Sequence, residues 1–283
     1  MKRKATRKVF YILVSLFVLA VLTGCSVTEK VDGDTVIRSI KPGDGFWDTV
    51  FVFPVAWLMN LLTGWVGHFA LGIVFTTIII RTIAFPIYTK SNDNSIKMQS
   101  VQPEIQKVQA KYAGKTDPES RQKMQMELMK VYKDNDINMF AGCLMPFLQM
   151  PIFMAMYHAV ARVPETFNYG AGRLNFFWTT LDSSGVSLDK WVNLILPILV
   201  VITSILQQKI SMIGISEEAK NNPTMKVMIY MMPLMMFFIS ISQVQALSLY
   251  WVAGNIYSTL QVIVVKRPFK KLNEKKPVTK FKK

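Results

Sequence analysis

Acidic residues are scarce in this chain, whose 283 residues include 18 Asp and Glu against 33 Lys and Arg. None of these carboxylates falls within the long apolar runs, although 51% of all residues are hydrophobic. The two cysteines and two histidines are too few for a disulfide framework or a metal-ligand pattern. The net charge of +15 suits an anionic partner, such as lipid headgroups, RNA or acidic polypeptide segments.

Catalytic motifs are absent as well. The sequence has no phosphate-binding P-loop, no GxSxG or HExxH motif, and no pair of carboxylates within an apolar run. The missing P-loop argues against an ATP-driven pump, and the internal inverted repeat of many secondary transporters is not apparent. We therefore expect a protein that is not an enzyme and that uses no metal or cofactor.

The first 24 residues have the pattern of a secretory signal peptide. Basic residues precede an apolar stretch, Val9 to Leu22, that is short for a membrane span. The stretch ends in Leu-Thr-Gly-Cys, which resembles a bacterial lipobox and implies cleavage before Cys25, a lipid on its thiol and a mature N-terminus outside the cytosol. The alternative is an uncleaved signal anchor. Residues 25–48 are polar and are predicted to be an exposed extracellular tether.

The apolar runs predict an all-α integral membrane protein with five transmembrane helices. The charge-free run 49–80 is too long for one span, so we divide it at Thr63 and Gly64 and assign its first part to an amphipathic helix at the outer interface. The predicted segments are the interfacial helix 49–63 and the core 64–268, with TM1 65–87, a cytosolic helical hairpin 88–136, TM2 137–161, TM3 191–209, TM4 225–242 and TM5 246–266, followed by a basic cytosolic tail 267–283.

Local signals mark the ends of several helices. Apolar residues recur at helical spacing up to Tyr112, and Asp117 before Pro118 is the predicted N-cap of a second hairpin helix that runs to about Tyr132. A tight turn near residues 242–245 separates TM4 from TM5. The tail is expected to be disordered because it is highly basic.

The distribution of charge predicts the orientation. The hairpin holds nine Lys and Arg, the 209–226 loop three, and the C-terminal residues 266–283 nine, whereas three basic residues in the 162–190 loop are balanced by three acidic ones. Positive loops stay cytosolic. We therefore expect a multi-pass protein of the cell membrane, with its lipid-anchored N-terminus outside and its C-terminus in the cytosol.

Arg81 is a cation within an apolar run, and it is the strongest candidate for a functional residue. A charge inside a bilayer is costly and usually faces a cavity or a partner, although a long side chain can also reach the headgroups from this depth. Other polar residues fall on single faces of the predicted spans, namely Thr77, Gln149, Thr203, Gln207, Ser248, Trp251, Asn255 and Ser258. Such residues often only join helices, but together with a cation they favour a polar cavity.

Four segments strongly resemble the YidC-type membrane protein insertases (the YidC/Oxa/Alb group). They are IIIRTIAFP, IKMQSVQPEIQKVQAKY, GCLMPFLQMPIFMAMY and SLYWVAGNIYSTLQ. The resemblance covers about residues 50–268, and the lipobox and the absence of a large periplasmic domain are similar to the Gram-positive form. One departure is the turn before Leu249-Tyr250-Trp251, where the family often carries Pro and Gly and this chain has Gln-Val-Gln-Ala.

The resemblance implies a five-helix core around a hydrophilic groove that is open to the cytosol and to lipid. It implies that the groove is lined by Arg81, by Gln207 or Gln208, and by Trp251, and that the hairpin is mobile. The implied function is the insertion of nascent membrane proteins, alone or with the Sec translocon, with the ribosome and membrane lipids as further partners. A secondary transporter for a small anion and a structural lipoprotein scaffold are the alternatives.

Overall fold

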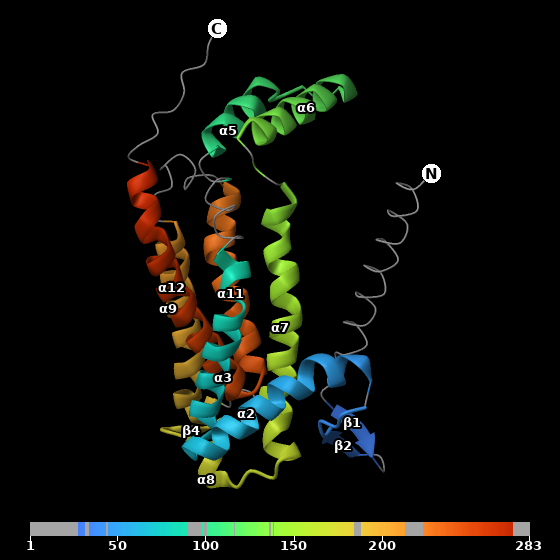
Figure 1. Ribbon diagram of the computed structural model, residues 1–283, viewed down its shortest axis with the longest axis vertical. Helices are drawn as coiled ribbons and strands as arrows, with labels where there is room; N and C mark the ends of the chain where they lie inside the picture. Colours follow the sequence, from blue (N-terminus) through green and yellow to red (C-terminus); the bar gives the residue numbers. More distant parts are fainter. Residues whose placement is uncertain are drawn as a thin grey trace. The chain divides into compact units, whose positions relative to one another are not determined.

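The computed structural model describes residues 28–31, 34–43, 45–89, 98, 101–115, 117–135, 137, 139–183, 188–212 and 223–273 (Figure 1). The predicted signal peptide and Cys25 lie outside the described residues. The chain divides into two compact units. Unit 1 comprises the described parts of Met1–Ile79, Phe147–Leu196 and Ser240–Tyr250, and unit 2 those of Ile80–Pro146, Pro197–Ile239 and Trp251–Lys283.

Unit 1 begins with a short antiparallel hairpin, in which β1 (Thr28–Val31) pairs with β2 (Asp34–Ile37). The chain after it is anchored, because Ile40, Trp47 and Asp48 are all buried. The prediction of an exposed tether over 25–48 is therefore wrong for its last part. Its composition is polar, but the Ile40 N–H and the Asp48 carboxylate bind residues of α7 (Met139–Thr166) that are distant in sequence, and Trp47 stacks on Phe51.

The break in the long apolar run lies at Gly67. A π-helical turn (Asp48–Val52) leads into α2 (Phe53–Val66), and Gly67 then adopts a left-handed conformation, with φ 77°, that ends the helix. Helix α3 (Phe69–Ile83) follows directly. We predicted the division at Thr63 and Gly64, but Gly64 lies inside α2. Both glycines could end a helix, and only Gly67 takes the left-handed conformation that glycine adopts at little cost.

Helix α2 packs closely on α3 and runs crosswise to it and to α7 (Met139–Thr166) (Figure 1). A β-carbon placed on Gly72 would lie 2.0 Å from Thr63 Oγ1. Only glycine at position 72 therefore allows the two helices to come this close. Tyr169 contacts both helices, because it donates a 2.7 Å hydrogen bond to Asn60 Oδ1 on α2 and packs edge-on against Phe69 on α3. These contacts fix the direction of α2.

A small loop structure completes unit 1. Helix α8 (Ala171–Leu174) is followed by a second hairpin, β3 (Asn175–Phe176) and β4 (Thr179–Thr180), and by a 3-10 helix (Leu188–Leu194). Helix α7 reaches Thr166, five residues beyond the predicted end of TM2 at 161. The prediction stopped at Arg162 because that residue is charged, but arginine is a good helix former, and its charge is paired with Asp48.

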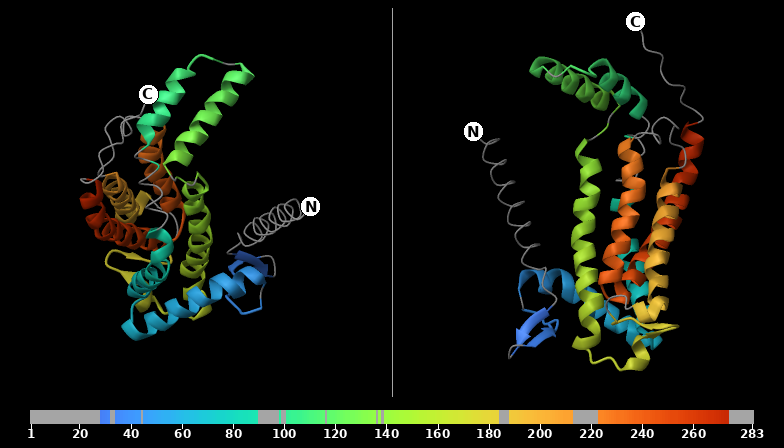
Figure 2. Two further views of the ribbon diagram at one scale, coloured as in Figure 1. Left: turned by 45° about the horizontal axis from the view of Figure 1, so that its top comes forward. Right: turned by 180° about the vertical axis from the view of Figure 1, so that it is seen from behind.

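Unit 2 contains the charged hairpin, in which α5 (Gln102–Lys111) lies beside α6 (Pro118–Asp134) (Figures 1 and 2). Its small core is made of Val101, Ile105 and Ile137. The predicted N-cap is confirmed, because Asp117 Oδ2 accepts a 2.7 Å hydrogen bond from the Ser120 N–H. Nearby, hydrogen bonds from Lys111 and Tyr112 lower the pKa of Glu127 below its ordinary value of 4.5.

Three further helices contribute to both units, namely α9 (Ile195–Ser211), α11 (Pro223–Ser242) and α12 (Gln245–Asn273). The two residues between α11 and α12 confirm the predicted tight turn. Residues 267–273 belong to α12, so the prediction that the whole tail is disordered is wrong for its first part. Lysine and arginine favour helix, and α12 continues across them and past Pro268 to Asn273.

Apolar length is sufficient for a membrane protein. Among the described residues, Asp48–Val66, Trp191–Ser211 and Gln245–Val264 are each long and apolar enough to cross a membrane. Phe69–Ile83 and Ile229–Ser242 are apolar but shorter. The assignment of five spans, and of 49–63 to the interface, stays a prediction.

Candidate functional site

Arg81 lies in the last turn of α3, within unit 2, and its guanidinium is held between an aromatic ring and a helix backbone. The guanidinium carbon is 5.3 Å from the centre of the Tyr88 ring, a cation–π distance. On α12, a β-carbon placed on Gly254 would lie 3.2 Å from Arg81 Nη2. Any side chain at position 254 would therefore crowd the guanidinium.

The local sequence explains how Tyr88 reaches Arg81. Pro86 has no N–H to donate to the carbonyl of residue 82, and regular helix is interrupted at Ala84 before a helical segment at residues 85–89. The Tyr88 N–H donates to the Ala84 carbonyl at 3.1 Å, which starts this segment. Tyr88 is only 2% exposed, so its ring is a fixed surface for the cation.

Arg81 has no acidic partner within the described part of the chain. The ion pairs found there join Arg38 and Arg162 to Asp48, Lys111 to Glu127, and Lys123 to Glu119. Arg81 Nε is buried, and no hydrogen-bond acceptor among the described residues meets it. An arginine normally uses its five donors when it is buried. This cation therefore retains capacity to bind an anionic group.

Two other predicted residues of unit 2, Asn255 and Thr203, form a polar link between α9 and α12. Asn255 Nδ2 donates to Thr203 Oγ1 at 3.1 Å and to Ser204 Oγ at 2.8 Å, and Asn255 is only 7% exposed. For Asn255 and Thr203 this geometry favours a role in joining α9 to α12 over a role in lining a cavity. Ser204 was not predicted, although it adjoins Thr203, because no periodic pattern distinguished it.

The remaining predicted residues lie in different surroundings. Trp251 and Ser258 are buried, each 8% exposed, and fall on the same face of α12 as Asn255. Gln207 and Gln208 on α9 are half-buried, and Gln208 Oε1 has no hydrogen-bond partner within the described residues.

Three predicted residues belong to unit 1, and one of them, Ser248 near the start of α12, is fully buried. Thr77 is 1% exposed, and its hydroxyl donates to the Ile73 carbonyl of its own helix at 2.7 Å. Gln149 is half-buried on α7. A groove lined by all the predicted residues stays a prediction.

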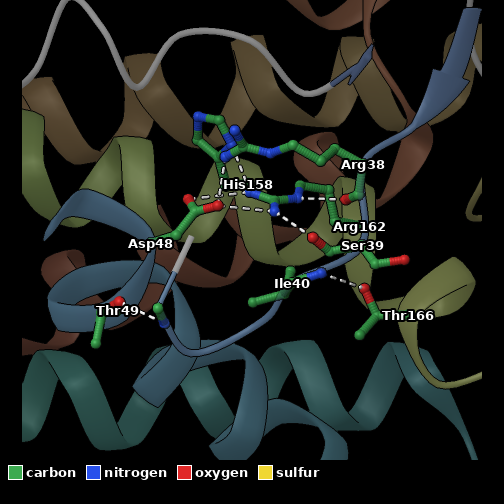
Figure 3. A network of polar contacts seen from close by, with 9 residues as sticks. Arg38, Ser39, Ile40, Asp48, Thr49, His158, Arg162 and Thr166 are labelled. Atoms are coloured by element: carbon green, nitrogen blue, oxygen red, sulfur yellow. Dashed lines mark hydrogen bonds and ion pairs between the residues drawn. The ribbon is translucent and has the colours of Figure 1, made fainter. Parts of the chain in front are cut away.

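Unit 1 contains a second buried arginine that sequence reasoning missed (Figure 3). The Arg162 side chain is 0% exposed, and it grips Asp48 with both terminal nitrogens, Nη1 to Oδ1 at 3.1 Å and Nη2 to Oδ2 at 2.9 Å. Arg162 Nε donates to the Arg38 carbonyl at 2.7 Å, and Nη2 donates to the Ser39 carbonyl at 2.8 Å. The Arg38 guanidinium also pairs with Asp48.

The network fixes the N-terminal segment against α7. Arg162 Nη1 lies 3.4 Å from His158 Nδ1, one helical turn earlier, and the Ile40 N–H donates to Thr166 Oγ1 at 3.0 Å (Figure 3). All five donors of Arg162 are thereby used. The signal available in the sequence was weak, namely one acidic residue immediately before the charge-free run and one basic residue immediately after TM2.

Known proteins resemble this chain over most of its length. The family model described as 60Kd inner membrane protein matches residues 61–274. The chain is 36% identical to the membrane protein insertase YidC of Oceanobacillus iheyensis, over 93% of this chain and 98% of that protein. It is 34% identical to the membrane protein insertase MisCA of Bacillus subtilis, over 94% of each.

A solved structure has a similar fold. It is the crystal structure of an active YidC insertase with its first transmembrane domain resolved, with a TM-score of 0.54 and 24% sequence identity. The match covers 79% of this chain and 47% of that one, so this chain spans about half the length of the solved protein. This likeness concerns the fold alone.

Proposed function

We infer that this protein, which belongs to the 60Kd inner membrane protein family of YidC-type insertases, inserts nascent membrane proteins into the cell membrane. The relatives described above are named as insertases, which gives no support to the anion-transporter alternative. The structural observation that carries the proposal is Arg81, a cation on an apolar helix with a buried donor that no described residue accepts.

The proposed first step is electrostatic. A short, acidic extracellular tail of the nascent protein enters a hydrophilic groove from the cytosol, and Arg81 attracts it. The attraction between unit charges about 4 Å apart is about 4 kcal/mol at an effective dielectric constant near 20, which offsets part of the cost of removing the carboxylate from water. Because Tyr88 and Gly254 hold the guanidinium, little ordering of Arg81 is needed when the tail arrives.

The proposed second step is hydrophobic and needs no nucleotide. The nascent transmembrane helix moves from water into lipid, and burial of its apolar surface drives the tail across. An uncompensated charge would be difficult to keep in a dry site, so the groove must contain water. Thr203, Gln207, Gln208, Trp251 and Ser258 are the residues of unit 2 proposed to line it with Arg81.

Further parts of the proposal rest on the sequence. Lipidation of Cys25 and a basic cytosolic side follow from the lipobox and the charge distribution. The charged hairpin is proposed to be mobile during insertion, and the basic end of the chain to contact the ribosome. Cooperation with the Sec translocon is proposed from the family alone.

The test is reconstitution. The purified protein is placed in liposomes that contain no other protein, and a single-span client with a short acidic tail is synthesised by ribosomes beside them. We expect protease to spare the tail only in liposomes that contain the protein. A client without its apolar span is the control and should stay fully digested. Equal protection in empty liposomes would contradict the proposed function.

The transporter alternative predicts a different pattern of access. In a chain whose native cysteines are replaced, Ser258→Cys on α12 is treated with a membrane-impermeant thiol reagent from either side. An insertase groove open only to the cytosol gives labelling from the cytosolic side. A transporter alternates its access, so it gives labelling from both sides.

A further inference from the structure

A cluster of three aromatic side chains forms the tip of the β3–β4 hairpin in unit 1. This aromatic tip consists of Phe176, Phe177 and Trp178. The Phe177 and Trp178 rings stack with their centres 5.7 Å apart, and Phe176 meets each of them edge-on, at 4.9 Å and 5.9 Å. The three rings therefore form one small apolar surface.

The tip faces outward at a conformational cost. Phe177 is 89% exposed, and Trp178 is 37% exposed. Phe177 has a φ of 46°, in the left-handed region that bulky residues rarely adopt. Such a conformation is strained for a bulky residue and persists only where the surrounding structure imposes it. The hairpin thus holds a large apolar ring away from its own core.

The base of the hairpin is fixed to the start of α12. Leu174 and Leu181 are buried on either side of the tip, and the Leu181 N–H donates to the Leu174 carbonyl at 3.0 Å. The Ala246 N–H donates to the Leu181 carbonyl at 2.9 Å, and the Gln245 N–H donates to the Ser183 carbonyl at 3.0 Å. Gln245 is also the first residue of an apolar stretch long enough to cross a membrane. The tip is therefore anchored at the level where that stretch begins.

The chemistry of the tip matches a lipid interface better than a protein surface. No charged residue lies between Arg173 and Asp182. Tryptophan and other aromatic residues collect at the boundary between headgroups and acyl chains, where an apolar ring with a polar edge is most stable. Trp191, which begins another apolar stretch in the same unit, is 70% exposed.

We propose that the aromatic tip inserts into the headgroup–acyl boundary of the membrane leaflet at the start of α12. Its partner is the lipid bilayer. By entering the boundary, the tip holds the first turn of α12 at a set depth through the two backbone hydrogen bonds at the base of the hairpin. This role requires only that the protein is embedded in a membrane, so it is independent of the proposed insertase activity.

The test uses tryptophan fluorescence of the full chain in liposomes. The sequence has six tryptophans, and five of them are replaced by phenylalanine so that only Trp178 remains. Lipids carrying bromine close to the headgroup, or deep in the acyl chain, quench a tryptophan that touches them. We expect a loss of Trp178 emission that is larger with shallow bromine than with deep bromine. A matched chain that keeps only Trp47, which is 6% exposed, should lose little emission with either lipid.

A second variant separates insertion from folding. Phe177→Gly removes the most exposed ring, and glycine accepts the left-handed conformation, so the hairpin should fold at least as well. In the Trp178-only chain this change should reduce shallow quenching. Quenching of Trp178 no greater than that of Trp47 would overturn the proposal, and so would quenching that Phe177→Gly leaves unchanged. Either result is expected if a second copy of the chain or another protein covers the tip.

Discussion

The two units each hold an arginine inside the protein, and the two are treated differently. Arg162 in unit 1 is fully buried, grips Asp48 with both terminal nitrogens and uses all five donors. Arg81 in unit 2 is half-buried, rests on Tyr88 and leaves its Nε without an acceptor among the described residues. The comparison shows that an arginine inside the protein can hold two segments together or can keep a donor available for a ligand. Which role it has depends on the acceptors around it.

The largest effect is expected when one partner of the buried Arg162–Asp48 ion pair is removed. Arg162→Ala leaves Asp48 buried beside Arg38 alone, so the free energy of unfolding should fall by about 3–5 kcal/mol. Thermal or denaturant unfolding in detergent micelles measures this change. Arg173→Ala is the matched control, because Arg173 is exposed and only stacks on Tyr169, and it should change stability little.

The same comparison is sharpened by removing both charges of the pair. Arg162→Met combined with Asp48→Leu should recover most of the stability lost by Arg162→Ala, because neither charge of the pair is left buried without the other, and the Arg38 side chain, which is 29% exposed, still reaches solvent. If the double variant is as unstable as the single one, the carbonyl bonds to Arg38 and Ser39 hold the segment more strongly than the ion pair does.

For Arg81 the expected loss is in function and not in stability. Arg81→Ala should reduce insertion of acidic-tailed clients at least about tenfold, which corresponds to about 1.4 kcal/mol, while the protein accumulates normally. Arg81→Lys should retain part of the activity, and Arg81→Glu should be worst because it repels the tail. Protease protection of the client tail, with each variant as the only copy in the cell, measures this series.

Clients with neutral tails serve as the internal control for the Arg81 series. Their insertion should fall least in Arg81→Ala. If Arg81→Glu inserts acidic-tailed clients fully at a normal protein level, attraction by Arg81 is not the mechanism. The two arginines would then differ only in how much they contribute to the stability of the protein.

A smaller effect is expected from Gly254→Ala. The new β-carbon would lie 3.2 Å from Arg81 Nη2, so the guanidinium must move by a few tenths of an ångström. Insertion should fall by less than in Arg81→Ala. Gly64→Ala is the matched control, because that helical glycine has nothing within 4 Å of an added β-carbon. Both changes favour helix by about 0.5–1 kcal/mol, so a loss seen only at position 254 is not caused by unfolding.

The smallest effect is expected at the exposed ion pair of the charged hairpin. Lys111 and Glu127 are 58% and 37% exposed, and pairs of this kind stabilise proteins little. Lys111→Ala should leave the melting temperature nearly unchanged at neutral pH. Because the pKa of Glu127 is lowered, its contribution is complete above the ordinary value of 4.5 and is lost as the pH falls below it. A marked loss of stability at neutral pH would contradict this ranking of buried over exposed pairs.

Local chemistry made much of the helical structure predictable. The Asp117 cap, Pro118 after it and the short turn between α11 and α12 were read correctly because each depends on residues that are adjacent in the sequence. The burial of Trp251, Asn255 and Ser258 on one face of α12 likewise follows from the spacing of residues along a helix.

Contacts between distant segments could not be predicted in the same way. Asp48 and Arg162 are 114 residues apart, and each was assigned to a solvent-exposed segment because a charge usually marks the end of an apolar run. The choice between Gly64 and Gly67 as the end of α2 also depends on packing, since α3 must leave at an angle that lets Gly72 approach Thr63. Such choices are made by the tertiary structure and not by local preference.

The two backbone hydrogen bonds at the start of α12 have a mechanical consequence. Helix α12 begins with its Gln245 and Ala246 N–H groups bound to the carbonyls of Ser183 and Leu181, which follow strand β4, so this end behaves as a pivot. A helix fixed at one end can swing but cannot slide along its own axis without breaking both bonds. We therefore expect α12 to move like a lever when a client passes. A spin label at Leu247 should keep its distance from one at Leu181, whereas a label at Ile263 should show a broader range of distances from the same point.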